Sequence, residues 1–257
     1  MQFFSKLVSF SCLAAVLAAQ DPTPVPAPAK KPPEPQPAVE ASAPKTLALG
    51  QRLDGKLTLL DIDGKPQKAH DLMGQITVVN FWSLQCPVQA DWNNRLADLQ
   101  KQYGAKGVTF LHIDSNVKEI DDGPSTVEEG TKPYAKIRAA LEQKKLPFRM
   151  LVDPGNKVAD VFEAKTTPHI YVFGKDGRLI YRGLVDDDQK DRNKDSRNNY
   201  LADTLDKLLA DEKVEPFSTK ETGCSIKRVP KAGQDGGGRR QRRGAGNGQG
   251  GGERGGN

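Results

Sequence analysis

The residue best suited to chemistry in this chain is Cys86, which stands directly before a proline at the junction of two predicted elements. An apolar, β-branched run at residues 75–82 precedes it, and an amphipathic pattern follows it. Proline is favoured at the first position of a helix, so Pro87 puts Cys86 at a helix N-terminus. Free amides and the positive end of the helix dipole stabilise a thiolate there. We therefore predict a nucleophilic thiol; the alternative is a buried, inert cysteine.

A second cysteine could cooperate with Cys86. Once Cys12 is removed with a predicted signal segment, Cys86 and Cys224 are the remaining cysteines. Cys224 follows the last predicted helix, and the neighbouring Lys227 and Arg228 would favour its thiolate. A disulfide requires Cα atoms within roughly 7 Å, which the sequence alone does not establish. The absence of other cysteines favours a pair, with a packed thiol or an intermolecular link as alternatives.

A long helix is predicted to carry Cys86 at its start. Apolar residues recur after it at spacings of four, four, three and four, which puts them on one face. They are Val88, Trp92, Leu96, Leu99 and Tyr103. Gly104 and Gly107 then end the helix.

Strands and helices alternate through the rest of the central region. Strands are predicted at 57–62, 65–72, 75–82, 108–113, 148–152, 170–173 and 178–182, and further helices at 131–145, 157–164 and 200–209. Asp63-Gly64 and Asp176-Gly177 suit the tight turns of two hairpins. This order predicts an α/β domain at residues 47–230, with an N-terminal β-hairpin and a central mixed β-sheet flanked by helices. The polar segment 114–130 is long enough to be functional or disordered.

The N-terminal residues are predicted to direct export. One lysine precedes an apolar run at 7–19 that is too short to span a membrane, so residues 1–19 read as a signal peptide. A lipoprotein anchored through Cys12 fits less well, because Phe10 stands where a small residue is expected. Residues 20–46 are rich in proline and form either an extended spacer or a disordered leader. We expect a periplasmic or extracellular protein.

The C-terminal tail, residues 231–257, is predicted to be disordered. It consists mainly of Gly, Arg, Gln and Asn and has no large apolar residue to bury. Its six basic and two acidic residues account for +4 of the net charge of +5, which leaves +1 for residues 1–230. This asymmetry excludes a protein coated evenly for nucleic acid, so any affinity for anionic surfaces belongs to the tail. No later segment is apolar enough to span a bilayer.

Neither a metal nor an organic cofactor is predicted. His70, His112 and His169 lie far apart, without HxxxH or CxxC companions. The segment 186–199 holds five aspartates but lacks the glycine of a calcium-binding loop, so we expect a solvated loop there.

Residues 81–89, Phe-Trp-Ser-Leu-Gln-Cys-Pro-Val-Gln, resemble the active-site segment of thioredoxin-fold proteins, particularly the redoxin branch of alkyl hydroperoxide reductases and thiol-specific antioxidants. Thr167-Pro168 before a strand resembles the cis-proline loop of that family, and residues 173–182 resemble its closing hairpin. The likeness spans about residues 47–209. It implies a thioredoxin-like fold in which Cys86 is the attacking cysteine.

The resemblance also implies which residues contact substrate. They flank the attacking cysteine or belong to the cis-proline loop, whose backbone pairs with substrate in such folds. They are Trp82, Ser83, Gln85, Pro87, Gln89, Thr167 and Pro168. His169 either lines the rim of this site or simply begins a strand.

Several positions depart from the family pattern. Gln89 replaces the second cysteine of the thioredoxin Cys-x-x-Cys, so a mixed disulfide on Cys86 must be resolved by another thiol, and Cys224 is the internal candidate. Asn80 replaces a buried aspartate that would accept a proton. A peroxiredoxin motif would need proline at Val79 and threonine at Ser83. Lys165 is only a loose substitute for the arginine that peroxiredoxins direct at the sulfur, so thiol exchange is better supported than peroxide reduction.

We therefore expect an exported thiol-disulfide oxidoreductase or peroxiredoxin-like antioxidant. Cys86 would attack a disulfide or a peroxide, Cys224 would resolve the product, and a partner thiol or disulfide protein would exchange electrons with the pair. The alternative function is a non-catalytic module that grips an extended peptide with the same fold.

Overall fold

The computed structural model describes residues 46–230 of the 257-residue chain. The predicted signal peptide, the proline-rich segment up to residue 45 and the tail from residue 231 lie outside the described residues. The strands of the main sheet are β1 Thr58–Asp61, β2 Pro66–Lys68, β3 Ile76–Trp82, β4 Val108–Asp114, β5 Met150–Val152, β7 His169–Phe173, β8 Leu179–Gly183 and β9 Phe217–Ser218. Two short strands, β6 Thr166–Thr167 and β10 Cys224–Ser225, form a separate pair. The helices are α1 Pro87–Gly104, α2 Ala135–Gln143, α3 Lys157–Val161 and α4 Tyr200–Leu209, with 3-10 turns at His70–Leu72 and Pro154–Asn156.

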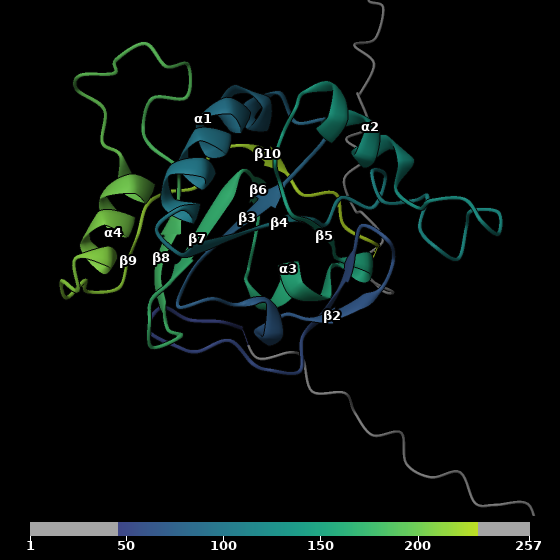
Figure 1. The fold of residues 1–257 in the computed structure, drawn as a ribbon, viewed down its shortest axis with the longest axis horizontal. Coiled ribbons are helices and arrows are strands. Elements are labelled where there is room, and N and C mark those ends of the chain that lie inside the picture. The colour runs from purple at the N-terminus through teal and green to yellow at the C-terminus, as the bar shows by residue number, and fades with distance from the viewer. Residues whose placement is uncertain (1–45, 231–257) are drawn as a thin grey trace, which may run out of the picture. The chain divides into compact units, whose positions relative to one another are not determined.

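The main sheet is mixed, with strand order β2-β1-β5-β4-β3-β7-β8-β9 (Figure 1). The central strands β3, β4 and β5 run parallel, whereas β1 and β7 run antiparallel to their central neighbours. Every residue of β3 is buried, because helices cover both faces of the sheet at this point. The predicted α/β domain, with its mixed sheet and N-terminal hairpin, is confirmed.

Side chains of β3 alternate between two hydrophobic cores. Val78 and Trp82 join α1 and α4 in one core, whereas Val79 and Phe81 join α3 in the other. Successive residues of a strand point to opposite faces, so one strand anchors both layers. The carboxyl end of β3 is therefore held from both sides immediately before Cys86.

Some element boundaries differ from those predicted. The helix expected at 131–145 begins only at Ala135, because Tyr134 has a left-handed φ of 57°. Strands β9 and β10 were not predicted, since two residues carry no readable periodicity. The segment 186–199 is not simply solvated: Asp186 is buried and accepts hydrogen bonds from Trp92 Nε1 at 3.2 Å and Arg95 at 2.5 Å.

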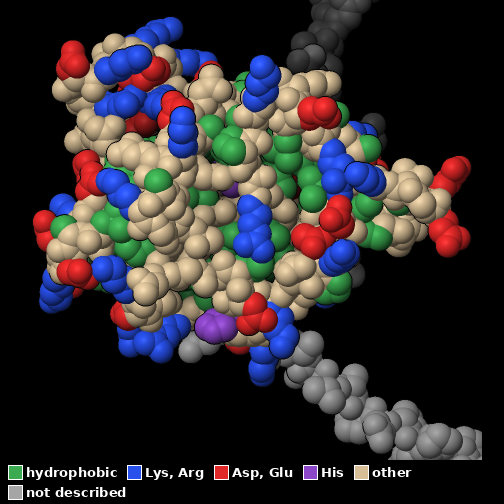
Figure 2. Space-filling model, in the orientation of Figure 1, with side chains coloured by type: hydrophobic (Ala, Val, Ile, Leu, Met, Phe, Trp, Pro, Cys, Tyr) green, Lys and Arg blue, Asp and Glu red, His purple; other side chains and the backbone are tan. Residues whose placement is uncertain are grey.

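Charged side chains are interspersed on the surface of the domain. On the face shown in Figure 2, basic and acidic groups alternate without a broad region of one sign. Opposite charges meet in pairs such as Lys136–Asp121 at 2.8 Å and Lys190–Asp91 at 2.8 Å. The face shown therefore presents no extended basic track for a polyanion.

Two of the three histidines are buried within strands. His112, on β4, stacks on Phe148 at a centroid distance of 3.8 Å, accepts a hydrogen bond from Asn80 at Nδ1 and bonds Gln100 Oε1 through Nε2. His169 begins β7 and bonds the Tyr171 hydroxyl. Burial lowers the pKa of His112 to about 3 and the pKa of His169 to about 4, because the charged imidazolium loses its hydration.

These two histidines should make the domain sensitive to acid. In the unfolded chain their pKa returns to about 6.5, so below that pH unfolding takes up protons that the folded state excludes. The stability that depends on these two neutral histidines is therefore fully present above pH 6.5 and is lost as the pH falls towards 4. At pH 5 each histidine should cost about 2 kcal/mol in the free energy of unfolding. In urea titrations at pH 7 and pH 5, His112→Gln should reduce the difference between the two pH values by about that amount.

The exposed His70 provides the control. His70→Gln should leave the difference between pH 7 and pH 5 as it is in the wild type. A His112→Gln protein with the full wild-type difference would contradict the assignment of acid lability to the buried imidazole.

Candidate active site

Cys86 caps the N-terminus of α1, as the sequence predicts. Its backbone is extended, with φ −78° and ψ 114°, and Pro87 occupies the first helical turn. The Gln89 amide donates a hydrogen bond to Cys86 Sγ at 3.2 Å. The sulfur therefore accepts a hydrogen bond at the positive end of the helix dipole.

The cis-proline loop lies against the same sulfur. The Thr167–Pro168 peptide bond is cis, as the resemblance implies, and Cys86 Sγ donates a hydrogen bond to the Thr167 carbonyl at 3.0 Å. Cys86 is only 3% exposed, and Thr167 and Pro168 are buried. Strand β6 thus runs directly beside the reactive atom.

Cys224 is brought to this site by strand β10. It pairs with Thr167 in the antiparallel β10–β6 ladder, and the Thr167 hydroxyl donates to the Cys224 carbonyl at 3.5 Å. The sulfur of Cys224 lies near the Cys86 thiol and the Val88 amide of α1, and both influence its pKa. Both thiols are free in this structure, so the pairing of Cys86 with Cys224 as a disulfide stays a prediction. In Figure 1, β10 lies next to α1 and β6.

The surroundings of Cys224 lower the acidity of its thiol. Burial raises the pKa of the Cys224 thiol, and the neighbouring Cys86 raises it further, outweighing the opposite effects of the Val88 amide and Lys227. Lys227 does favour the Cys224 thiolate, as expected, but its effect is the smaller one. Arg228 is engaged elsewhere, by the Asp160 carboxylate and the Ala164 carbonyl. Cys224 keeps its proton at neutral pH beside Cys86.

Glu119 holds the turn that leads from β3 to Cys86. Its carboxylate accepts hydrogen bonds from Ser83 Oγ at 2.7 Å, from the Leu84 amide at 2.6 Å and from the Gln85 amide at 3.2 Å. Ser83 Oγ in turn accepts from the Cys86 amide at 3.1 Å. Glu119 is itself buried, so these donors stabilise its charge.

Asp114 lies behind Glu119 at the end of β4, where it pairs in register with Trp82. Burial raises the pKa of Asp114 well above its usual value, and Glu119 adds to the effect. The protonated form of Asp114 is thus favoured next to the Glu119 carboxylate. The sequence analysis did not identify Glu119. The only signal for it in the sequence was the polar segment that follows β4. Parallel neighbours such as β3 and β4 end at the same edge of the sheet.

Two residues expected to contact substrate are instead part of the interior. Trp82 and Gln89 are both 0% exposed. The Trp82 indole and the Gln89 amide group both donate to Asn93 Oδ1, at 3.1 and 3.0 Å, and Asn80 donates to Gln89 Oε1 at 3.3 Å. These bonds fasten the first turns of α1 to β3. We therefore correct the expectation of direct contact: both side chains position the helix that Cys86 caps.

The other residues that were expected to contact substrate differ in their exposure to solvent. Gln85 and Pro87 are exposed on either side of Cys86, whereas Ser83 is buried between Glu119 and the Cys86 amide. Lys165 is 70% exposed at its side chain and pairs with Glu221 at 3.2 Å, so it does not substitute for an arginine directed at the sulfur.

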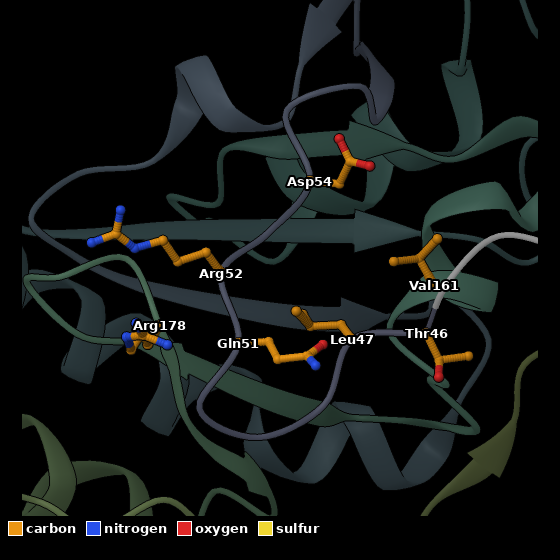
Figure 3. Close-up of a pocket in the computed structure, with 7 residues that line it drawn as sticks. All are labelled: Thr46, Leu47, Gln51, Arg52, Asp54, Val161 and Arg178. Atoms are coloured by element: carbon orange, nitrogen blue, oxygen red, sulfur yellow. The ribbon is translucent and has the colours of Figure 1, made fainter.

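One hollow of the described surface lies away from this site. It has a volume of about 460 Å³ and is lined by Leu47, Gln51, Arg52, Val161, Arg178 and their neighbours (Figure 3). Arg178 belongs to the turn that follows Phe173 of β7. Phe173 pairs with Thr77, near the start of β3, whereas Cys86 follows the end of β3. None of the labelled residues in Figure 3 is a cysteine or a histidine, so this hollow offers no thiol chemistry.

The described part of the chain contains neither a metal-ligand cluster nor a helix suited to crossing a membrane. No group of three His, Cys, Asp or Glu side chains comes together as a metal-ligand set between residues 46 and 230. Within the same residues, no helix has the length and apolar character needed to cross a membrane.

Comparison with known proteins finds relatives that are named thiol-disulfide oxidoreductases. The chain is 23% identical over 120 residues to the thiol-disulfide oxidoreductase ResA of Bacillus cereus, and 22% identical over 138 residues to ResA of Halalkalibacterium halodurans. The Bacillus cereus match covers 47% of this chain and 61% of that protein, so the chain spans about three-fifths of the length of this relative.

Among solved structures, an uncharacterised conserved protein from Geobacillus kaustophilus is 27% identical, with a TM-score of 0.61 over 73% of this chain and 95% of the other. A hypothetical protein from Sinorhizobium meliloti is 23% identical, with a TM-score of 0.57 over 72% of this chain and 97% of the other, and shares the fold.

The AhpC/TSA family pattern matches residues 50–182, which is more than half of the chain. This region contains β3, Cys86, α1 and the cis-proline loop, the features on which the resemblance rested. The chain therefore belongs to the AhpC/TSA family of thioredoxin-like redoxins.

Proposed function

We propose that the protein is a thiol-based oxidoreductase in which Cys86 is the attacking thiolate and Cys224 resolves the product. The observation that carries this proposal is the meeting of both cysteines at the cis-proline loop beside the N-terminus of α1: Cys86 Sγ accepts the Gln89 amide bond and contacts Thr167 O, and Cys224 pairs with Thr167. Family membership and the thiol-disulfide oxidoreductase relatives support the same chemistry.

The reaction needs two displacements at sulfur. With a disulfide, the Cys86 thiolate attacks one sulfur, the S–S bond breaks, and the second sulfur leaves as a thiolate. Cys224 then attacks Cys86 in this mixed disulfide, and the bond between Cys86 and the substrate sulfur breaks. The departing thiolate takes up the proton that Cys224 loses, and a Cys86–Cys224 disulfide is left. With a hydroperoxide, the first step makes a Cys86 sulfenic acid, and attack by Cys224 releases water. A thiol partner returns the two electrons by reducing the disulfide.

The environments of the two sulfurs support this division of roles. Cys86 accepts the Gln89 amide bond as the residue that caps the helix, whereas the raised pKa of Cys224 keeps a proton available for the leaving group. Gln89 cannot serve as a second thiol, and its side chain is occupied by Asn80 and Asn93.

The alternative of a peptide-gripping module is not favoured, because β10 of the same chain already pairs with β6. Export to the periplasm or the cell exterior stays part of the proposal and rests on residues 1–19, which lie outside the described residues. The basic tail, residues 231–257, also lies outside them, and its affinity for anionic surfaces stays a prediction.

Substitution of the two cysteines should separate the two steps. Cys86→Ser should abolish reduction of hydrogen peroxide and of insulin, because no other described group replaces its thiolate. Cys224→Ser should react once through Cys86 and then stop, because the product cannot be resolved internally. Mass mapping of the oxidised, non-reduced full chain should find a peptide pair joined by Cys86 and Cys224.

Ser225→Ala is the matched control, since it alters the exposed neighbour of Cys224 in β10 without removing a thiol. It should turn over like the wild type. Unchanged turnover by Cys86→Ser would eliminate Cys86 as the nucleophile, and full turnover by Cys224→Ser would eliminate Cys224 as the resolving thiol.

Glu119 should act as a positioning residue. Glu119→Gln keeps the shape of the side chain but puts an amide NH₂ where one oxygen accepts a backbone hydrogen bond, so one of the three donors loses its acceptor. Unfolding free energy should fall by about 1–3 kcal/mol. Hydrogen exchange at the Leu84 and Gln85 amides should accelerate, and alkylation of Cys86 should slow as its turn loosens.

The exposed Glu129 in the same segment supplies the comparison, and Glu129→Gln should change none of these quantities. If Glu119→Gln lowered stability but left exchange at Leu84 and Gln85 and the alkylation of Cys86 unaltered, its role would be structural only.

A further inference from the structure

We infer that a groove beside strand β1 binds a single-chain amphiphile with an anionic head, such as a medium-chain fatty acid. This binding is separate from the thiol chemistry proposed above. The groove consists of two hollows, called here the head hollow and the chain hollow. Their volumes, about 420 and 350 Å³, lie in the range of small-molecule sites.

The two hollows adjoin each other. Leu60 and Pro154 line both of them, so the hollows meet at these side chains. The head hollow follows residues 56–60 and is bounded by Pro154 and Lys157. The chain hollow reaches the insertion after β4, where Asp121 is neutralised by Lys136 at 2.8 Å. Most side chains of the chain hollow are apolar, namely Leu60, Val117, Ile120, Pro124, Tyr134 and Pro154.

The head hollow exists because the pairing of β1 with β5 stops early. These strands pair only through Leu60 and Asp61 of β1. Continuing the same register would put Pro154 opposite Thr58, and proline has no amide hydrogen to donate. The chain enters the 3-10 turn Pro154–Asn156 instead, which leaves a notch beside Thr58.

The Thr58 amide is directed into this notch, because residues of an antiparallel strand bond alternately to either side. The Ala69 amide donates to the Leu57 carbonyl at 2.8 Å. The Asp61 amide donates to the Lys65 carbonyl at 2.9 Å, so the odd-numbered residues of β1 bond towards β2. Thr58 therefore turns its N–H to the other side, where no acceptor from residues 46–230 bonds it. An amide left in this way can donate to a carboxylate.

Two lysines supply positive charge to the head hollow. Lys56 precedes β1 and Lys157 begins α3, and both line the hollow. Neither forms an ion pair with a carboxylate of residues 46–230. Asp54, the acid closest to Lys56 in the sequence, accepts from the Lys56 amide at 3.0 Å and lines a different hollow. Lysine stems can cover apolar surface while their ammonium groups stay in water, which suits the head of an amphiphile.

These features select the class of ligand. A carboxylate head would receive one amide and two ammonium groups, and a hydrocarbon chain needs no hydrogen bond from the apolar side chains beyond Leu60. A polypeptide would bring amides and carbonyls into the chain hollow, where the apolar side chains cannot bond them. A cationic amphiphile would meet Lys56 and Lys157 with like charge.

The test measures binding to the full-length protein by isothermal titration calorimetry. The probes are octanoate, decanoate and laurate below their micelle concentrations, with dodecyltrimethylammonium as the cationic comparison. Burial of the chain should lower the dissociation constant by about fourfold per added methylene. The cationic amphiphile should bind about tenfold or more weakly than laurate.

Substitutions in the two hollows should have different effects. Lys56→Glu combined with Lys157→Glu should weaken all three carboxylates by a similar factor of about tenfold or more. Val117→Asp puts a charge in the chain hollow and should instead reduce the gain per methylene. The exposed Lys101 of α1 lines neither hollow, so Lys101→Glu is the matched control and should leave every affinity within about twofold. Thermal unfolding of each variant checks that the fold is retained.

The inference is overturned if laurate shows no saturable binding, if the cationic amphiphile binds as tightly, or if the double lysine variant keeps the wild-type affinity. It is also overturned if sedimentation reveals a dimer that the double lysine variant dissociates, because a second copy would then fill the groove. Cys86→Ser should bind laurate like the wild type, so a failure of the proposed thiol chemistry would leave this inference intact.

Discussion

The site depends on the unpaired amides at the first turn of α1. The Gln89 amide donates a hydrogen bond to Cys86 Sγ, and the Val88 amide lies near the sulfur of Cys224, which comes from a distant part of the chain. Helix termini leave such amides without backbone acceptors, so an atom that accepts them is held by geometry and by charge together. Cys86 meets this requirement through its place at the helix cap, and Cys224 meets it through the pairing of β10 with β6.

Much of the surrounding structure keeps that helix end in place. Strand β3 is buried on both faces and ends one short turn before the helix, and the turn itself is bonded to Glu119. Below it, Asn80 and Asn93 tie Gln89 to the sheet, so the polar side chain that replaces a second cysteine becomes part of the scaffold. Buried polar groups contribute to a unique arrangement when their partners are present, which is the case for the Gln89 side chain.

The second sulfur reaches the site at the end of a long connection. Thr167 and Cys224 are separated by 57 positions, and β9 and β10 are only two residues each. Such short strands cannot hold by themselves, so the anchors at Asn116, Asn156 and Asp160 supply the rest of the stability. The same arrangement that delivers Cys224 also occupies the edge of β6.

The sequence by itself determined the local elements. The apolar run of β3, the helical spacing after Pro87 and the two Asp-Gly turns each encode their structure within a few residues, and from them follow the α/β fold and the position of Cys86. The cis-proline loop was implied by the family resemblance. Only the tertiary structure decided what depends on residues far apart: the partnership of Cys86 with Cys224, the bonds of Glu119, the burial of Trp82 and Gln89, and the raised pKa of Cys224. The physical reason is that acidity, burial and pairing depend on neighbours in space, which a local pattern does not specify.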